Sequence, residues 1–111
     1  MLYTEFVAGG KEYKLRLATR NIIALEKAIG TNPLGIFGSG EDIPSVTAMT
    51  NILFHSLQKF QHGISFDDAT NIFDAYLEDH SVTDFISVIL DIYRVSGIIK
   101  TDKEETEEKN V

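Results

Sequence analysis

The chain contains no cysteine and no tryptophan, and only two prolines among its 111 residues. Without cysteine it can form no disulfide and no thiolate metal site, and it has no cysteine nucleophile. No run approaches the ~18 apolar residues that a membrane-spanning helix needs, so we expect no membrane association. The first residues lack the basic start and apolar stretch of a signal peptide, and we therefore expect a soluble intracellular protein.

Positive charge is also scarce, because 10 Lys and Arg stand against 17 Asp and Glu for a net charge of −7. Affinity for nucleic acid comes mainly from Lys and Arg, so a compact acidic domain is poorly suited to bind it. The imbalance is uneven: residues 1–40 carry five basic and three acidic side chains, whereas residues 41–99 carry two and nine. Such polarity favours a head-to-tail contact between copies.

The remaining composition is that of a globular domain, with 43% hydrophobic and 24% charged residues. Residues 100–111 contain one apolar residue, Val111, and eight charged ones. Such a segment cannot bury enough surface to offset its ordering entropy. We therefore predict a single domain over 1–99 and a disordered acidic tail over 100–111.

The N-terminal residues are typical of β-structure. Tyr13, Leu15 and Leu17 alternate with Lys14 and Arg16, which predicts a strand with one apolar and one cationic face. A partner strand within 2–7 and a Gly-Gly turn complete a predicted hairpin over 2–17. Because an isolated hairpin is only marginally stable, it must lie on helices or join strands of another copy.

From Thr19 onward the apolar residues recur with the period of a helix. We predict helices at about 19–29, 45–61, 66–79 and 82–96, with Thr19 as the first N-cap and Gly30 as the first stop. Ser65 and Ser81 each precede an Asp by three residues, as in a capping box, and Phe66 is predicted to face inward. The fourth helix is apolar nearly all round, which is typical of a central or interface helix. The predicted fold class is α+β, mainly α: an N-terminal β-hairpin followed by about four packed helices.

The polar residues show no pattern typical of an active site. The three histidines are His55, His62 and His80. The first two are seven apart, whereas a helical zinc site needs a spacing of four. The adjacent acid pairs 67–68 and 78–79 point in different directions on a helix. The glycine-rich segment 35–40 lacks the Lys-Ser/Thr of a phosphate loop and precedes two acids. We therefore expect no enzyme, no cofactor and no metal.

Several apolar residues lie in the long loop or off the apolar stripes of the predicted helices, where we expect one small monomer to leave them uncovered. These candidate partner-binding or self-association residues are Leu34, Ile36, Phe37, Phe54, Val88 and Ile92. Recruitment into an ordinary core is the alternative interpretation. The candidate intersubunit charges are Lys14 and Arg16 on one side and Asp67, Asp68 and Asp74 on the other.

Three segments resemble one protein family. Thr19-Arg20, Leu25-Glu26-Lys27, Gly30 and Asn32-Pro33-Leu34 are similar to a segment of the tail assembly chaperones of long-tailed phages and prophages of Gram-positive bacteria. The strand Tyr13–Leu17 before them, and Gly63–Ala69 continuing into Asp74–Glu78 after them, also resemble that family. The resemblance covers roughly residues 10–98.

The resemblance implies a chaperone that coats the tape measure protein while the tail tube protein polymerises around it. It implies a homo-oligomer in the host cytoplasm that is absent from the mature virion, with the tube protein as a second partner. It implies no catalytic residues. Two alternatives stay open: a small acidic prophage-encoded adaptor that binds a basic host protein, and a structural tail component retained in the virion.

Overall fold

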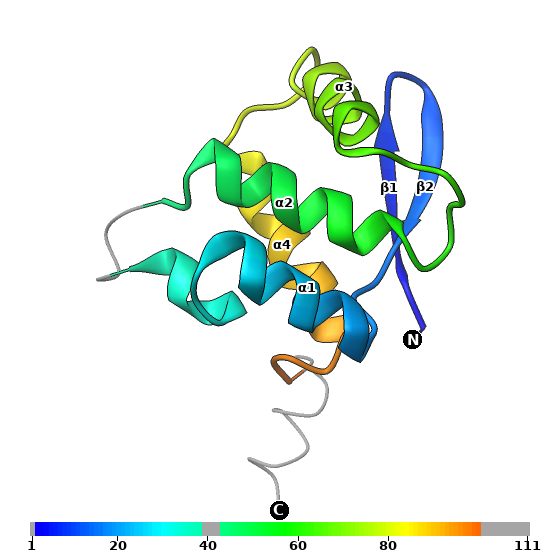
Figure 1. Cartoon of the computed structure of the whole chain (residues 1–111). Helices are drawn as coiled ribbons and strands as arrows, with labels where there is room; N and C mark the ends of the chain where they lie inside the picture. Colours follow the sequence, from blue (N-terminus) through cyan, green and yellow to red (C-terminus); the bar gives the residue numbers. More distant parts are fainter. Residues whose placement is uncertain (1, 39–42, 101–111) are drawn as a thin grey trace, which may run out of the picture.

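The computed structural model describes residues 2–38 and 43–100 and shows a β-hairpin followed by four α-helices (Figure 1). Strands β1 (Thr4–Ala8) and β2 (Lys11–Leu15) form an antiparallel sheet. The predicted α+β, mainly α fold is thereby confirmed. Apart from Lys100, the predicted tail at 100–111 lies outside the described residues and stays a prediction.

The hairpin turns at Gly9 and Gly10, whose φ angles are +58° and +74°. Two consecutive residues with positive φ suit a tight hairpin, because their twist matches that of the strands. The inner face of the sheet is buried and consists of Phe6, Ala8, Tyr13 and Leu15. β1 packs on α3 and α4, and β2 packs on α2, so the chain's own helices stabilise the hairpin.

The outer edge of β2 is bonded to the helical part of the chain. The Gln61 side-chain amide accepts from the Lys14 N–H at 2.8 Å and donates to the Lys14 carbonyl at 2.9 Å. The Arg16 N–H donates to the Ser56 carbonyl at 3.0 Å. These contacts satisfy backbone groups that would otherwise face solvent at the edge of the sheet.

The four helices are α1 (Thr19–Ile29), α2 (Val46–Leu57), α3 (Phe66–Tyr76) and α4 (Asp84–Val95). The first has the predicted bounds and ends at Gly30, whose φ is +74°. The other three are shorter than predicted: α2 and α3 end early in turns, and α4 starts late because a turn precedes it. Thr19 is not the N-cap of α1: that position belongs to Ala18, whose N–H donates to the Asn21 side chain at 3.0 Å.

The predicted capping box at the start of α3 is present. The Ser65 Oγ accepts from the Asp68 N–H at 3.0 Å, and the Asp68 carboxylate accepts from the Ser65 N–H at 2.9 Å. Ser81 and Asp84 make the same pair of bonds, at 3.1 and 2.8 Å. There the bonds enclose a turn, and α4 starts only at Asp84.

The core lies between the hairpin and the helices, with α4 buried behind α2 and α1 in the view of Figure 1. Phe6 of β1 connects the two parts, since its ring lies 5.0 Å from that of Tyr76 on α3, and within the helical part Phe73 stacks on Phe85 at 4.7 Å. The inward position predicted for Phe66 is wrong, because its side chain is 42% exposed. As the first residue of α3 it lies beyond the core and packs against Phe54 instead, at 5.6 Å.

The glycine-rich connection after α1 contains a short 3₁₀ helix, η1 (Pro33–Phe37), which the sequence analysis did not predict. The Asn32 side chain starts it by accepting from the N–H groups of Leu34 and Gly35, at 2.9 and 3.0 Å. The buried Tyr93 hydroxyl donates to the Pro33 carbonyl at 2.7 Å. This bond ties the connection to the central helix, and burial raises the pKa of Tyr93.

Candidate protein-binding site

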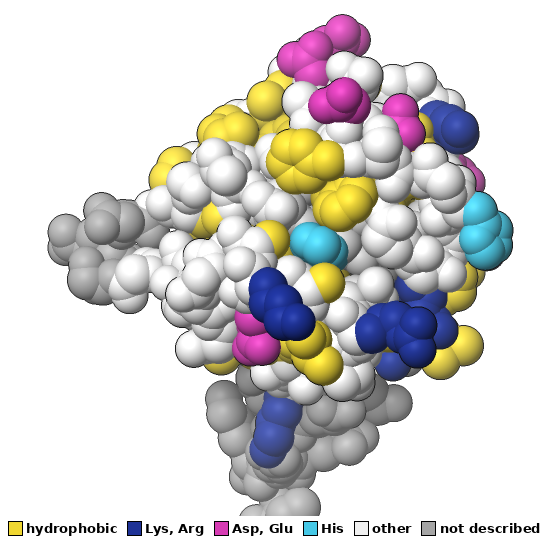
Figure 2. All heavy atoms as spheres, in the orientation of Figure 1, with side chains coloured by type: hydrophobic (Ala, Val, Ile, Leu, Met, Phe, Trp, Pro, Cys, Tyr) yellow, Lys and Arg dark blue, Asp and Glu magenta, His cyan; other side chains and the backbone are white. Residues whose placement is uncertain are grey.

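A shallow groove of about 240 Å³ runs between α2 and α3, with mainly apolar walls. It is lined by Val46, Thr50, Thr70, Asn71, Phe73, Asp74 and Leu77. We call it the α2–α3 groove. Hydrophobic side chains are exposed over these two helices (Figure 2). Solvent reaches 52% of Val46 at the N-terminal end of α2.

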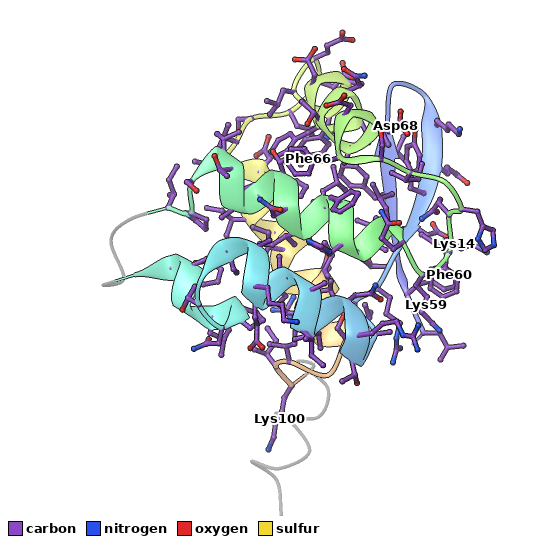
Figure 3. The ribbon with its side chains drawn as sticks, in the orientation of Figure 1. Lys14, Lys59, Phe60, Phe66, Asp68 and Lys100 are labelled. Atoms are coloured by element: carbon purple, nitrogen blue, oxygen red, sulfur yellow. The ribbon has the colours of Figure 1, made fainter. Side chains whose placement is uncertain are left out.

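Helical spacing arranges the two walls as rows. On α2, Val46, Thr50 and Phe54 are four residues apart and so lie on one face. On α3, Phe66, Thr70 and Asp74 follow the same spacing. The contact between Phe54 and Phe66 joins the two rows at one end, and Phe66 lies between α2 and α3 in Figure 3.

The charges near the groove are all negative. Asp67, Asp68 and Asp74 on α3 are exposed, and α3 carries no Lys or Arg. The backbone N–H and then the hydroxyl of Ser65 hold the pKa of Asp68 below its usual value. Asp74 lines the groove itself. The site therefore suits a partner whose apolar anchors are flanked by basic side chains.

The structure separates the six predicted apolar surface residues. Leu34 is 48% exposed, whereas Ile36, Phe37, Phe54 and Val88 are partly buried against the core. Ile92 is fully buried, so its prediction as a surface residue is wrong. Helix α4 is covered on more than one side, and its second apolar face therefore packs within the monomer. None of the six lines the α2–α3 groove, but Phe54 continues the α2 row one turn beyond Thr50 and contacts Phe66.

Val46, Thr50, Thr70 and Leu77 were not predicted to line a groove, and Phe66 was predicted to face inward. The four-residue row from Val46 to Phe54 was a usable signal, because it lies off the apolar stripe of α2. Nothing local indicated that this row would meet the row on α3.

The alternation predicted for residues 13–17 is present, because Tyr13, Leu15 and Leu17 are buried whereas Lys14 is exposed, but the outer face of the whole hairpin is not uniformly cationic. In the observed register Glu5 is opposite Lys14, and Glu12 is on the same outer face. Instead, Lys14 and Arg16 lie beside Lys59, at one end of the hairpin (Figure 3). The predicted acidic partners, Asp67, Asp68 and Asp74, are on α3. Within the described residues no ion pair joins the two sets, so their pairing between copies stays a prediction.

The three histidines lie in different surroundings. His55 is half-buried beside Phe54, at 4.8 Å, and burial lowers its pKa. His80 stacks on Tyr76 at 4.3 Å, and His62 is exposed. Within residues 2–38 and 43–100, no group of three or more His, Asp or Glu side chains could hold a metal ion.

Comparison with known proteins gives no match to a family model, to a curated protein or to a solved structure. In the part of the chain that the structure describes, no helix is long and apolar enough to cross a bilayer. The features of the chain that bear on its function are thus the surfaces described above and the three segments that resemble one family.

Proposed function

We propose that the protein is a phage tail assembly chaperone, which binds and solubilises the tape measure protein without enzymatic activity. The observation that carries this proposal is the α2–α3 groove, an exposed apolar surface on an acidic domain. The resemblance of residues 10–98 to the chaperone family supplies the identity of the client.

The groove has the shape needed to hold one face of a client helix. Helix-in-groove recognition uses apolar anchors at positions i, i+3 or i+4, and i+7 of the bound helix. A helix of 12 residues, such as α2, is ~18 Å long, which matches about three turns of a client. Val46 at one end and the Phe54–Phe66 pair at the other provide two apolar contact points for such anchors.

The negative charge contributes selectivity and solubility. Asp74 lines the groove and Asp67 follows Phe66 on α3, so both favour a client helix with basic residues beside its anchors. A net charge of −7 also limits aggregation of a protein that exposes apolar side chains. Both properties suit a chaperone that holds an apolar client in solution.

The proposal extends to partners and location. The protein acts in the cytoplasm of the bacterial host as a homo-oligomer, contacts the tail tube protein as a second partner, and leaves before the virion is complete. An adaptor for a host protein would bind that protein rather than the tape measure protein. A structural tail component would be found in purified virions by mass spectrometry.

The deciding experiment co-expresses the chain with the tape measure protein of the same phage and measures the soluble fraction of that client. Phe66→Ser should weaken binding about tenfold or more, because truncating an aromatic anchor commonly costs over ~1.4 kcal/mol. The matched control is Ile23→Ser, since Ile23 is 49% exposed on α1, outside the groove lining. It should change binding less than about twofold.

Thermal unfolding of both variants verifies that each remains folded. If the wild-type chain does not raise the soluble fraction of the tape measure protein above that of the client expressed alone, the proposed chaperone function is wrong. If Phe66→Ser and Ile23→Ser weaken client binding equally, the α2–α3 groove is not the binding site.

A further inference from the structure

A second surface combines positive charge with aromatic rings at the end of the hairpin. The Lys14 Nζ lies 4.9 Å from the centre of the Tyr3 ring, and Tyr3 packs edge-on against Phe60 at 5.4 Å. The Arg16 guanidinium donates to the Leu2 carbonyl at 3.2 Å. A pocket of about 530 Å³ adjoins them, lined by Leu2, Arg16, Ala18, Thr19, Lys59 and Phe60. We call Tyr3, Lys14, Arg16, Lys59 and Phe60, with this pocket, the basic–aromatic surface.

The three cations of this surface have no carboxylate partner within the described residues. The described residues do contain an ion pair, but it joins Arg94 to Asp91 on α4, outside the residues of this surface. Glu5 is opposite Lys14 in the sheet but does not reach ion-pair distance. Lys14, Lys59 and Phe60 lie together in Figure 3, and the Lys and Arg side chains form one cluster there in Figure 2. An acidic, extended peptide is the ligand that such a surface fits.

We propose that the basic–aromatic surface binds the chain's own C-terminal segment, residues 101–111, within the same molecule. That segment carries five acidic and two basic residues, and all five acids lie within residues 102–108. It is therefore the densest acidic stretch of the chain. Its charge is complementary to the three cations, which lie in a protein that is otherwise acidic.

The point at which the segment leaves the fold places it within reach. The Leu17 N–H donates to the Ser96 Oγ at 2.8 Å, so the end of α4 lies beside the residue that follows Arg16. Only residues 97–99 separate Ser96 from Lys100. Eleven further residues can span up to ~36 Å. A tether of this length gives an effective concentration of the order of 1 mM, so even weak binding suffices for docking.

Docking covers the basic–aromatic surface until a competing acidic partner or high salt displaces the segment. This regulation concerns a different surface from the α2–α3 groove and does not depend on the proposed function.

The absence of cysteine makes a direct test possible. Thr106→Cys introduces a single thiol for a nitroxide spin label in the full-length, ¹⁵N-labelled chain. If the tail is docked at least half of the time, which needs an intrinsic Kd below ~1 mM, the amide peaks of Lys59 and Phe60 should lose about half their height or more. The peaks of Thr70 and Asn71 at the α2–α3 groove should keep theirs. In 1 M salt, where screening acts over ~3 Å, the loss should disappear.

Two charge variants separate the proposal from a non-specific effect. Lys14→Glu/Lys59→Glu should abolish the loss, whereas Lys11→Glu/Lys27→Glu, with the same change in net charge, should retain it. If the first variant does not fold, neutralising the tail with Gln at residues 104, 105, 107 and 108 serves the same purpose, because these residues lie outside the described fold.

Three results would overturn the inference. The first is that the peaks of Lys59 and Phe60 keep their height, and the second is that the two charge variants behave alike. The third is a loss of these peaks when ¹⁵N-labelled protein without a spin label is mixed with spin-labelled ¹⁴N protein. The last result would show that the tail of a second copy occupies the surface.

Discussion

The hydroxyl of Tyr93 offers the sharpest test of the packing around the central helix. Tyr93 is fully buried, and its hydroxyl is bonded to the Pro33 carbonyl at 2.7 Å, sixty residues away in sequence. Tyr93→Phe removes one atom, preserves the ring and leaves that carbonyl without its partner. It therefore isolates the contact that ties η1 to α4.

The expected cost follows from burial. An unsatisfied buried acceptor destabilises a protein by about 1–3 kcal/mol. For a domain of this size, each kcal/mol lowers the midpoint of thermal unfolding by about 4–8 °C. We therefore expect the Tyr93→Phe variant to unfold about 8 °C or more below the wild type at neutral pH, if the loss is near 2 kcal/mol. Tyr3→Phe, at a partly exposed ring, should change stability by less than about 0.5 kcal/mol.

The pH dependence provides an independent test. Burial raises the pKa of Tyr93 in the folded state, whereas an unfolded tyrosine titrates near pH 10. The stabilising contribution of the neutral hydroxyl is thus complete below about pH 10 and is lost as the pH rises further. At pH 11 the wild type should have lost about 1.4 kcal/mol that the Tyr93→Phe variant does not lose.

Urea unfolding at pH 8 and pH 11, followed by circular dichroism, measures both effects. The free-energy difference between wild type and Tyr93→Phe should be clear at pH 8 and should narrow by about 1.4 kcal/mol at pH 11. A difference that is absent at pH 8, or that is the same at both values, would refute the assignment of a buried, neutral, hydrogen-bonded hydroxyl.

Two further predictions concern local structure. Ser65→Ala should cost about 1 kcal/mol in urea unfolding by removing the α3 cap, while Ser87→Ala on the exposed side of α4 should cost little. Because the pKa of Asp68 is lowered, its contribution is present above about pH 4 and lost below it, so Asp68→Asn should approach the wild type in acid. Gly9→Ala should destabilise more than Gly10→Ala: each residue pays the ~1 kcal/mol cost of positive φ, but a Cβ at Gly9 would also lie 3.3 Å from the Ala75 Cβ. Equal midpoints of thermal unfolding for the two glycine variants would contradict that contact.

Local signals allowed part of this fold to be predicted. The bounds of α1 followed from Ile22, Leu25 and Ile29 at helical spacing, with Gly30 as the stop. The capping box of α3 likewise depends on residues only three apart. The start of α4 was placed too early, because Ser81 and Asp84 can make the same bonds around a turn. Periodicity cannot distinguish these two outcomes.

The candidate sites depended on contacts that are distant in sequence. Ile92 was predicted at the surface because it lies off the main stripe of α4, but packing on a second side of that helix buries it. Lys59 lies beside Lys14 only because Gln61 bonds to the backbone of β2 across 47 residues. A short window of sequence does not show on how many sides a helix will be buried, or which distant residues will lie beside each other.

The hydrogen bonds along β2 have a consequence for how copies of the chain can meet. Sheets commonly extend from molecule to molecule when a strand with free backbone groups recruits another. Here Gln61 occupies both backbone groups of Lys14, and Ser56 accepts from Arg16. A strand of a second molecule could pair along this side only if the bonds from β2 to Gln61 and Ser56 were broken first. The chain's own helices thus block growth of the sheet from molecule to molecule on this side of β2.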